Sequence, residues 1–167
     1  MEILTPSTVA QLDQTRALMR GFVAWHRQRH VDDLHLIDRY FDAAAFDAEL
    51  AGLPGSYAPP RGQLLLARVD GQPAGCVALR PMDDASCEMK RMFVDPQQQG
   101  HGIGRALAVR LIDHARAAGF AQLWLDTSVR QTEALQLYRS LGFETVEPYY
   151  SLPPDLEQWL VFLRLDL

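Results

Sequence analysis

The residues with the clearest chemical potential are three closely spaced glycines, Gly100, Gly102 and Gly104, a few positions after Asp95-Pro96. A strand-like segment ends at the proline, and a helix-like segment begins at the last glycine. The first four backbone N–H groups of a helix have no partner within it, and the helix dipole adds about half a positive charge there. Glycine has no Cβ, so a ligand can approach its backbone closely. The run therefore predicts a site for an anion such as phosphate.

The spacing of the glycines excludes two common phosphate-binding motifs. The dinucleotide fingerprint is G-x-G-x-x-G, whereas this chain has glycine at every second position from Gly100 to Gly104. The nucleotide-triphosphate loop ends in G-K-[ST], whereas Gly104 is followed by Arg105-Ala106. Taken alone, the run is either a phosphate-binding loop or a glycine-rich turn that only caps a helix.

The other reactive side chains form no cluster that the sequence reveals. His26 and His30 are four residues apart, but no Glu completes an H-E-x-x-H motif and no cysteine pair completes a zinc site. We expect packing or solvated histidines and no metal. Cys87 has no evident His or Asp partner and is predicted to be a small buried side chain. Cys76 and Cys87 are the only cysteines, too few for a disulfide framework. We therefore expect both thiols to be reduced and the protein to be cytoplasmic.

Length, composition and charge limit the class of protein. The chain has 167 residues, 48% apolar and 22% charged, which is typical of one globular domain over residues 1–167. Sixteen Lys and Arg against 21 Asp and Glu give a net charge of −5, the wrong sign for a general nucleic-acid binder. No apolar run reaches the ~18 residues of a membrane span, and the N-terminus lacks a secretory signal pattern. We expect no nucleic-acid or membrane partner.

The elements that would position the glycine loop follow from the hydrophobic pattern. Strand character at 63–69 and 74–79 flanks the turn Asp70-Gly71 and predicts a hairpin. A strand at 88–94, the glycine loop, a helix and a strand at 123–125 predict a parallel, right-handed crossover. The sequence thus predicts one α/β domain with a mixed central sheet and helices on both faces. The other expected elements are a strand at 3–4, helices after Thr8, at 42–50 and at 134–141, a loop at 52–62, and strands at 143–146 and 160–165.

The residues around the glycines resemble the acyl-coenzyme A loop of the GNAT acetyltransferase superfamily. The core of that loop is Gln/Arg-x-x-Gly-x-Gly/Ala, matched here by Gln99, Gly102 and Gly104. A second family motif lies in Ala134-x-x-Leu137-Tyr138-x-x-Leu141-Gly142-Phe143, and the strand 88–94 resembles a common family variant. The motifs span residues 63 to 146, and the order of elements extends the resemblance to the whole chain.

The resemblance implies that the chain binds acetyl-CoA as a cosubstrate and needs no metal. The diphosphate would lie on the amides of the glycine loop, and the pantetheine arm would pair with the preceding strand. Gln131 stands where many members carry Asn, so its amide is a contact of longer reach. Arg105 either reaches a phosphate or is solvated. The expected cofactor-binding residues are Met92, Phe93, Val94, Gln99, Gly100, His101, Gly102, Ile103, Gly104, Arg105 and Gln131.

The resemblance also implies direct acetyl transfer to a primary amine. Tyr138 aligns with the family tyrosine that acts as general acid, and a phenol with a reference pKa of about 10 stays protonated at neutral pH. Its alternative role is a core aromatic. Glu88 is the expected general base; the alternatives are a surface carboxylate paired with Lys90 or Arg91, or a base that acts through water. A backbone N–H near Phe93 is the expected donor to the thioester oxygen.

The acceptor is not specified by these motifs, and a small molecule or a peptide or protein amine would fit equally. The segment 25–61 is expected to shape the acceptor side, and an acidic protein favours cationic amines through its field. The alternative function is a non-catalytic acyl-CoA-binding regulatory module. Homodimers are frequent in the family, although no strand or apolar stripe here demands one. The aromatic residues expected near the acceptor are Trp25, Tyr57, Tyr149 and Tyr150.

Overall fold

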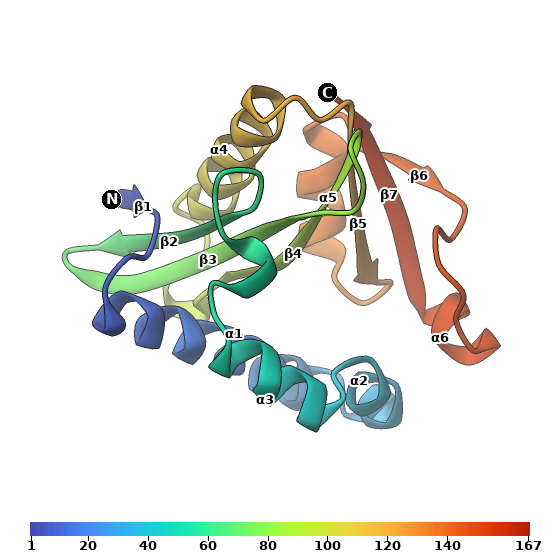
Figure 1. The fold of residues 1–167 in the computed structure, drawn as a ribbon. Coiled ribbons are helices and arrows are strands. Elements are labelled where there is room, and N and C mark those ends of the chain that lie inside the picture. The colour runs from blue at the N-terminus through green and yellow to red at the C-terminus, as the bar shows by residue number, and fades with distance from the viewer.

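Seven strands form one mixed sheet in the computed structural model, which describes all 167 residues. Their order is β1-β2-β3-β4-β5-β7-β6 (Figure 1). Every strand expected from the sequence is present, and the turn at Asp70-Gly71 joins an antiparallel hairpin. The strands are β1 (Glu2–Leu4), β2 (Gln63–Val69), β3 (Gln72–Pro81), β4 (Ser86–Val94), β5 (Gln122–Ser128), β6 (Glu144–Val146) and β7 (Leu160–Asp166).

Two of the helices begin at residues whose side chains satisfy free backbone donors. Thr8 accepts from the N–H of Gln11 at 3.2 Å, and the Gln11 side chain accepts from the Thr8 N–H at 3.2 Å, so the two form a capping box. Asp42 caps the helix that begins at Ala43, because its side chain accepts from the N–H of Ala45 at 2.9 Å. No helix combines the length and apolar character that crossing a membrane requires. The helices are α1 (Val9–Arg29), α2 (Leu34–Tyr40), α3 (Ala43–Ala51), α4 (Ile103–Ala117), α5 (Thr132–Ser140) and α6 (Pro154–Trp159).

Two of these helices were not expected from the sequence. Helix α2 is short, and the segment around its start, His30 to His35, is mostly polar. These polar residues obscure the helical spacing of the apolar residues that follow. Helix α6 begins at Pro154, and proline fits the first helical position because that N–H lacks a helical partner anyway. The segment 52–62 is a loop as expected, with one 3₁₀ turn at Gly55–Tyr57.

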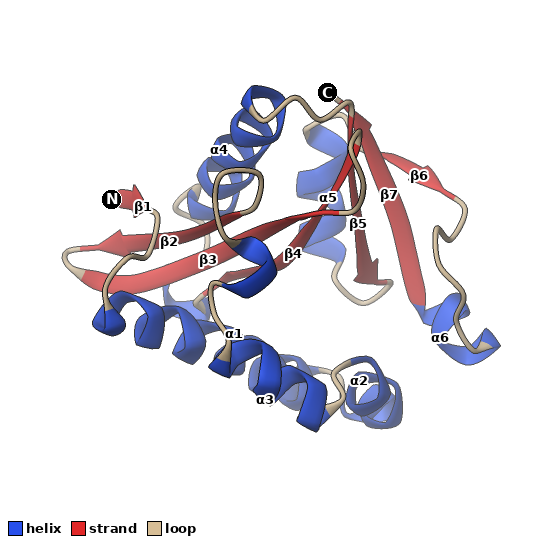
Figure 2. Cartoon of the chain, viewed as in Figure 1, coloured by secondary structure: helices blue, strands red, loops and turns tan.

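Helices cover both faces of the sheet, as predicted (Figure 2). On one face, α4 and α5 pack on the central strands around fully buried Leu107 and Leu111. On the other face, α1 and α3 pack on β2 and β3 through Met19 and Leu50. A third apolar cluster joins α2, α6 and β7 around Ile37. The sheet is therefore sandwiched between helices, and an opening lies at its centre.

That opening lies between β4 and β5, which pair in parallel as predicted. Their ladder covers only Ser86 to Glu88 on β4, opposite Gln122 to Trp124 on β5. Beyond it the two strands diverge (Figure 1). A register shift in the β3–β4 ladder accompanies the divergence, and Arg91 has a positive φ of 57° there. Such a bulge bends a strand and redirects its side chains.

Candidate active site

Three adjoining cavities occupy the opening between β4 and β5. The loop groove has a volume of about 380 Å³ and is bounded by the glycine loop, α1 and α5. The inner chamber, of about 60 Å³, lies between the diverging strands. The outer cleft, of about 680 Å³, is bounded by α2, the end of β3 and the loop before α6. Met92 and Gln131 line both the groove and the chamber. Tyr40, Lys90 and Arg91 line both the chamber and the cleft. Ligands entering from opposite sides would meet at the chamber.

The loop groove is built by the glycine run. Asp95 accepts from the N–H of Gln97 at 2.8 Å, and the Gln99 side chain donates to the carbonyl of Val94 at 3.3 Å, so the loop is fixed to the end of β4. The backbone N–H groups of residues 100–105 have no acceptor within the protein. Gly100 and Gly102 have φ values of +82° and +75°, and an added Cβ at either would meet no atom within 4 Å. The loop therefore presents free donors to open space, as an anion site requires.

Ten of the eleven expected cofactor residues line this groove; the exception is His101. His101 is exposed, with Nδ1 at 3.3 Å from the carbonyl of Gln98. Arg105 lines the groove but is neither free nor merely solvated, because its guanidinium donates to Ser140 Oγ at 2.6 Å and so ties α4 to α5.

Sequence reasoning missed one wall of the groove. Arg29 at the end of α1 and Glu133 at the start of α5 form an ion pair at 2.7 Å, and both line the groove. The Arg29 guanidinium also lies 5.0 Å from the centre of the Trp25 ring. Trp25 was expected near the acceptor, and the structure corrects this: it lines the loop groove and not the outer cleft. No local pattern links α1 to α5, which are about a hundred residues apart.

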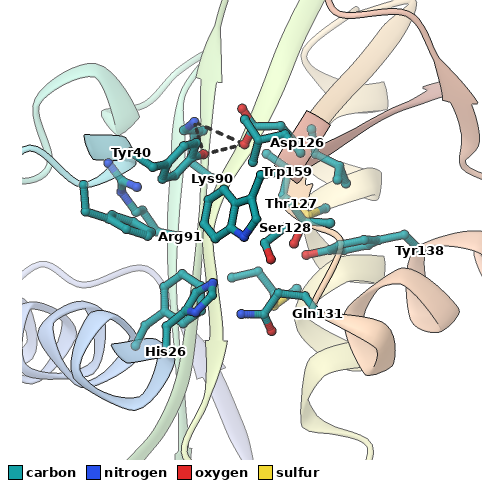
Figure 3. Close-up of a pocket in the computed structure, with 16 residues that line it drawn as sticks. His26, Tyr40, Lys90, Arg91, Asp126, Thr127, Ser128, Gln131, Tyr138 and Trp159 are labelled. Atoms are coloured by element: carbon teal, nitrogen blue, oxygen red, sulfur yellow. Dashed lines mark hydrogen bonds and ion pairs between the residues drawn. The ribbon is translucent and has the colours of Figure 1, made fainter. Parts of the chain in front are cut away.

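The inner chamber holds polar groups without partners, on Tyr138, Gln131 and His26 (Figure 3). Tyr138 is buried, and its hydroxyl has no hydrogen-bond partner in the structure. Burial, with a smaller effect of Asp126, raises the pKa of Tyr138 above its ordinary value, so the phenol stays protonated. The Nε2 of Gln131 is also buried and unpartnered. An unpaired buried donor is costly, which indicates that a ligand group completes it.

His26 is a further lining residue of the chamber. It is buried between Phe22 and Trp159, and its Nδ1 has no partner. Burial is the main cause of the lowered pKa of His26, so its imidazole is uncharged at neutral pH. The sequence predicted packing or solvated histidines, and the tilted contacts of His26 with two aromatic rings agree with the first role. No three metal-ligating side chains converge anywhere in the chain.

The floor of the outer cleft carries Glu88, the expected base. Arg80 Nε donates to Glu88 Oε2 at 2.7 Å, and Nη2 forms an ion pair with the same oxygen at 2.6 Å. Tyr149 donates to Oε1 at 2.7 Å, and Lys90 lies 3.5 Å from the same oxygen. Glu88 thus pairs with Lys90, one of its two expected partners, but not with Arg91. It lines the outer cleft and not the chamber that holds Tyr138.

Asp126 on β5 is a second buried carboxylate that sequence reasoning missed. Tyr40 donates to Asp126 Oδ1 at 2.5 Å, Tyr150 donates to Oδ2, and Lys90 lies 3.8 Å from Oδ1. Burial, followed by the charge of Asp126, raises the pKa of both tyrosines, so these phenols stay protonated donors. Tyr40 and Asp126 are 86 residues apart, and only the fold brings them together.

Arg91 and Tyr57 form the support behind the cleft. Arg91 donates to Glu49 through Nε and Nη2, at 2.8 and 2.5 Å, and Tyr57 donates to the same carboxylate at 2.7 Å. Burial opposes ionisation of Glu49, but the bonds from Arg91 outweigh it, and the pKa of Glu49 is lowered. Tyr57 was expected to line the acceptor pocket; the structure corrects this, because it supports Glu49 and does not line the outer cleft. Tyr149 and Tyr150 do line it.

Comparison with known proteins is consistent with this site. Residues 25–143 match the model of the acetyltransferase (GNAT) family. An uncharacterized N-acetyltransferase of Schizosaccharomyces pombe is 39% identical over 124 residues, which cover 72% of this chain and 74% of that protein. Several other related N-acetyltransferases are longer, and this chain spans about half of their length.

Solved structures share the fold. An acetyltransferase from Streptococcus agalactiae has a TM-score of 0.75 and 21% identity, with 99% of this chain and 98% of that chain covered. A GNAT family acetyltransferase from Elizabethkingia anophelis, solved with acetyl-CoA bound, has a TM-score of 0.58 and 24% identity, with 75% and 83% covered. Both confirm the predicted architecture of a mixed sheet between layers of helices.

Proposed function

Because this chain belongs to the GNAT family of acetyltransferases, we propose that it moves an acetyl group from acetyl-CoA directly to a primary amine of a small molecule, peptide or protein. The single observation that carries the proposal is the meeting of two separate cavities at a chamber with an unpaired phenol and an unpaired amide. One cavity suits the acyl donor and the other suits the amine. Direct transfer needs such an arrangement because both reactants must be held in contact.

The loop groove fits the cosubstrate. The free N–H groups of residues 100–105 and the open space at Gly102 suit the diphosphate. Met92, Phe93 and Val94 lie on the part of β4 beyond its ladder with β5, where an amide-bearing arm can add as a strand. Gln131 Nε2 is the buried donor nearest the chamber that such an arm would satisfy. Acetyl-CoA itself supplies an activated acyl thioester.

Tyr138 is the proposed general acid. Its hydroxyl lies in the chamber, is unpaired, and stays protonated because burial raises its pKa. It can therefore donate a proton to the departing sulfur without first losing a competing hydrogen bond. We also propose that a backbone N–H near Phe93 donates to the thioester oxygen.

Glu88 is the proposed general base, directly or through water. It lies on the acceptor side of the chamber, at the floor of the outer cleft. An amine that reaches the chamber through the cleft passes this carboxylate and can lose its proton there. Asp126, also buried in this network, neutralises Lys90 together with Glu88. The acid and the base would thus act from opposite sides of the reacting atoms.

Calorimetric titration with acetyl-CoA, followed by an assay of thiol release with an amine panel, tests the proposal. We expect saturable binding and amine-dependent release of CoA. Absence of binding at millimolar acetyl-CoA would refute the proposal. Binding without any release, unaffected by Tyr138→Phe and Glu88→Gln, would instead support the non-catalytic regulatory module. Light scattering with and without acetyl-CoA tests whether the chain forms the homodimer that is frequent in the family.

A further inference from the structure

The lining of the outer cleft has an unusual charge for this protein. Four of the chain's 16 Lys and Arg residues line it, but only one of its 21 Asp and Glu residues does. The chain as a whole carries a net charge of −5. The ratio of basic to acidic side chains is therefore much higher in the lining of the cleft than in the whole chain. Its basic residues are Arg39, Arg80, Lys90 and Arg91.

Two of the carboxylates that pair with these cations, Glu88 and Asp126, lie beneath the surface of the cleft. The side chains of Glu88 and Asp126 are 3% and 1% exposed. The side chains of Arg39 and Arg80 are 46% and 45% exposed. Asp155, the exposed partner of Arg39, does not line the cleft, so the lining offers guanidinium groups at the rim and a carboxylate only at the floor.

The two rim guanidinium groups keep donors that the protein does not use. Arg80 binds Glu88 through Nε and Nη2, which leaves Nη1 free. Arg39 uses Nη1 in an exposed pair with Asp155, and its other nitrogens have no partner. Exposed ion pairs of this kind contribute little and exchange readily. A planar guanidinium with free N–H groups is well suited to bind a carboxylate.

We propose that the acceptor is an amine that also carries a carboxylate, that is, an amino acid, bound with its amine at the floor and its carboxylate at the Arg39–Arg80 rim. This inference rests on the proposed function and names the substrate class of the same site. It reverses the sequence-based expectation of a cationic amine, because net charge describes the average surface and not one cleft. A dication would place its second charge against two exposed guanidinium groups.

Amines matched in length but differing in their second group test the inference. Thiol release from acetyl-CoA is measured with 4-aminobutanoate, n-butylamine and 1,4-diaminobutane, and with L-amino acids against their amides. Rates are compared at equal concentrations of unprotonated amine. We expect kcat/KM for the carboxylate-bearing member to exceed that of its partner by about tenfold or more, as charge-assisted hydrogen bonds allow.

Variants at the rim test the source of the preference. Arg39→Gln should reduce the ratio of kcat/KM between carboxylate-bearing and neutral amines about fivefold, and Arg39→Lys should retain part of it. Arg27→Gln is the matched control, because Arg27 forms a similarly exposed ion pair with Asp38 and does not line the cleft. This control should leave the ratio unchanged.

Acetyl-CoA affinity, measured in parallel, separates the two proposals. Loss of acetyl-CoA binding would refute the proposed function. Normal binding with equal or faster acetylation of butylamine or diaminobutane would overturn the inference alone. Normal binding with no acetylation of any carboxylate-bearing amine would also overturn it.

Discussion

Replacement of Gly102 by alanine should weaken acetyl-CoA binding far more than it weakens the fold. Gly102 has a φ of +75°, and an added Cβ would enter the open space of the loop groove. The left-handed conformation costs a residue with a Cβ about 1–2 kcal/mol. In a chain of this length each kcal/mol lowers the melting temperature by about 2–4 °C. The expected loss of stability is therefore about 2–8 °C.

The effect on binding adds a separate contribution. The methyl group would occupy the space that the diphosphate needs to reach the loop N–H groups. One hydrogen bond to a charged group contributes about 1.5–3 kcal/mol, so loss of one such contact raises Kd about 10- to 150-fold. Isothermal titration with acetyl-CoA measures this change, and thermal unfolding without ligand measures the cost to the fold.

Gly119, at the opposite end of α4, offers a matched control. It follows the C-terminal end of α4, has a φ of +83°, and has equally open surroundings. Gly119→Ala should cost similar stability because the backbone strain is similar, yet it should leave Kd unchanged because Gly119 does not line the groove. Equal acetyl-CoA affinity of the two variants would refute the assignment of the diphosphate to this loop.

Four further outcomes follow from the buried groups. Tyr138→Phe should lower kcat about 10²- to 10⁴-fold with little change in acetyl-CoA affinity or melting temperature, because the hydroxyl has no partner; steady-state kinetics and titration check this. Glu88→Gln should lower kcat/KM by a similar factor, whereas an unchanged kcat/KM would exclude Glu88 as base. His26 and His30 have lowered pKa values, so the unfolded chain binds more protons below the ordinary value of 6.5. The free energy of unfolding should therefore fall as the pH drops through 6.5, as urea titrations at several pH values would show. This fall should be smaller in His26→Asn, whereas the exposed control His35→Asn should show the same fall as the unsubstituted protein. Leu107→Ala, at a fully buried position on α4, should cost about 2–5 kcal/mol in the same assay.

The parts of the fold that the sequence predicted well are those with local signals. Strand β2 was expected at 63–69 and is found at Gln63–Val69, because Leu64 to Leu66 form an apolar run before the turn at Asp70-Gly71. Helix α1 begins after Thr8, and α3 begins after Asp42, since both residues have side chains that cap a helix. The glycine loop was found for the same reason, because its chemistry lies in consecutive residues.

The parts that were missed depend on contacts between distant segments. Asp126 has no neighbour in sequence that marks it, and its role appears only when Tyr40 and Tyr150 reach it from two other elements. The placement of Trp25 depends on the direction of α1 across the sheet, which periodicity alone does not give. The cationic rim of the outer cleft also arises from two elements, because Arg39 lies on α2 and Arg80 on β3.

The short ladder between β4 and β5 has a consequence for solubility. Unpaired strand edges invite other chains to add to a sheet and aggregate, and proteins usually shield them at the periphery. Here the open edges lie in the interior, with Phe22 and Trp25 of α1 on one flank and Ala134 and Leu137 of α5 on the other. The two helices thus separate these edges from neighbouring molecules, while the loop groove still gives a ligand access to β4. The fold thus keeps these unpaired strand edges out of reach of other chains, so that the opening can bind a ligand without promoting aggregation.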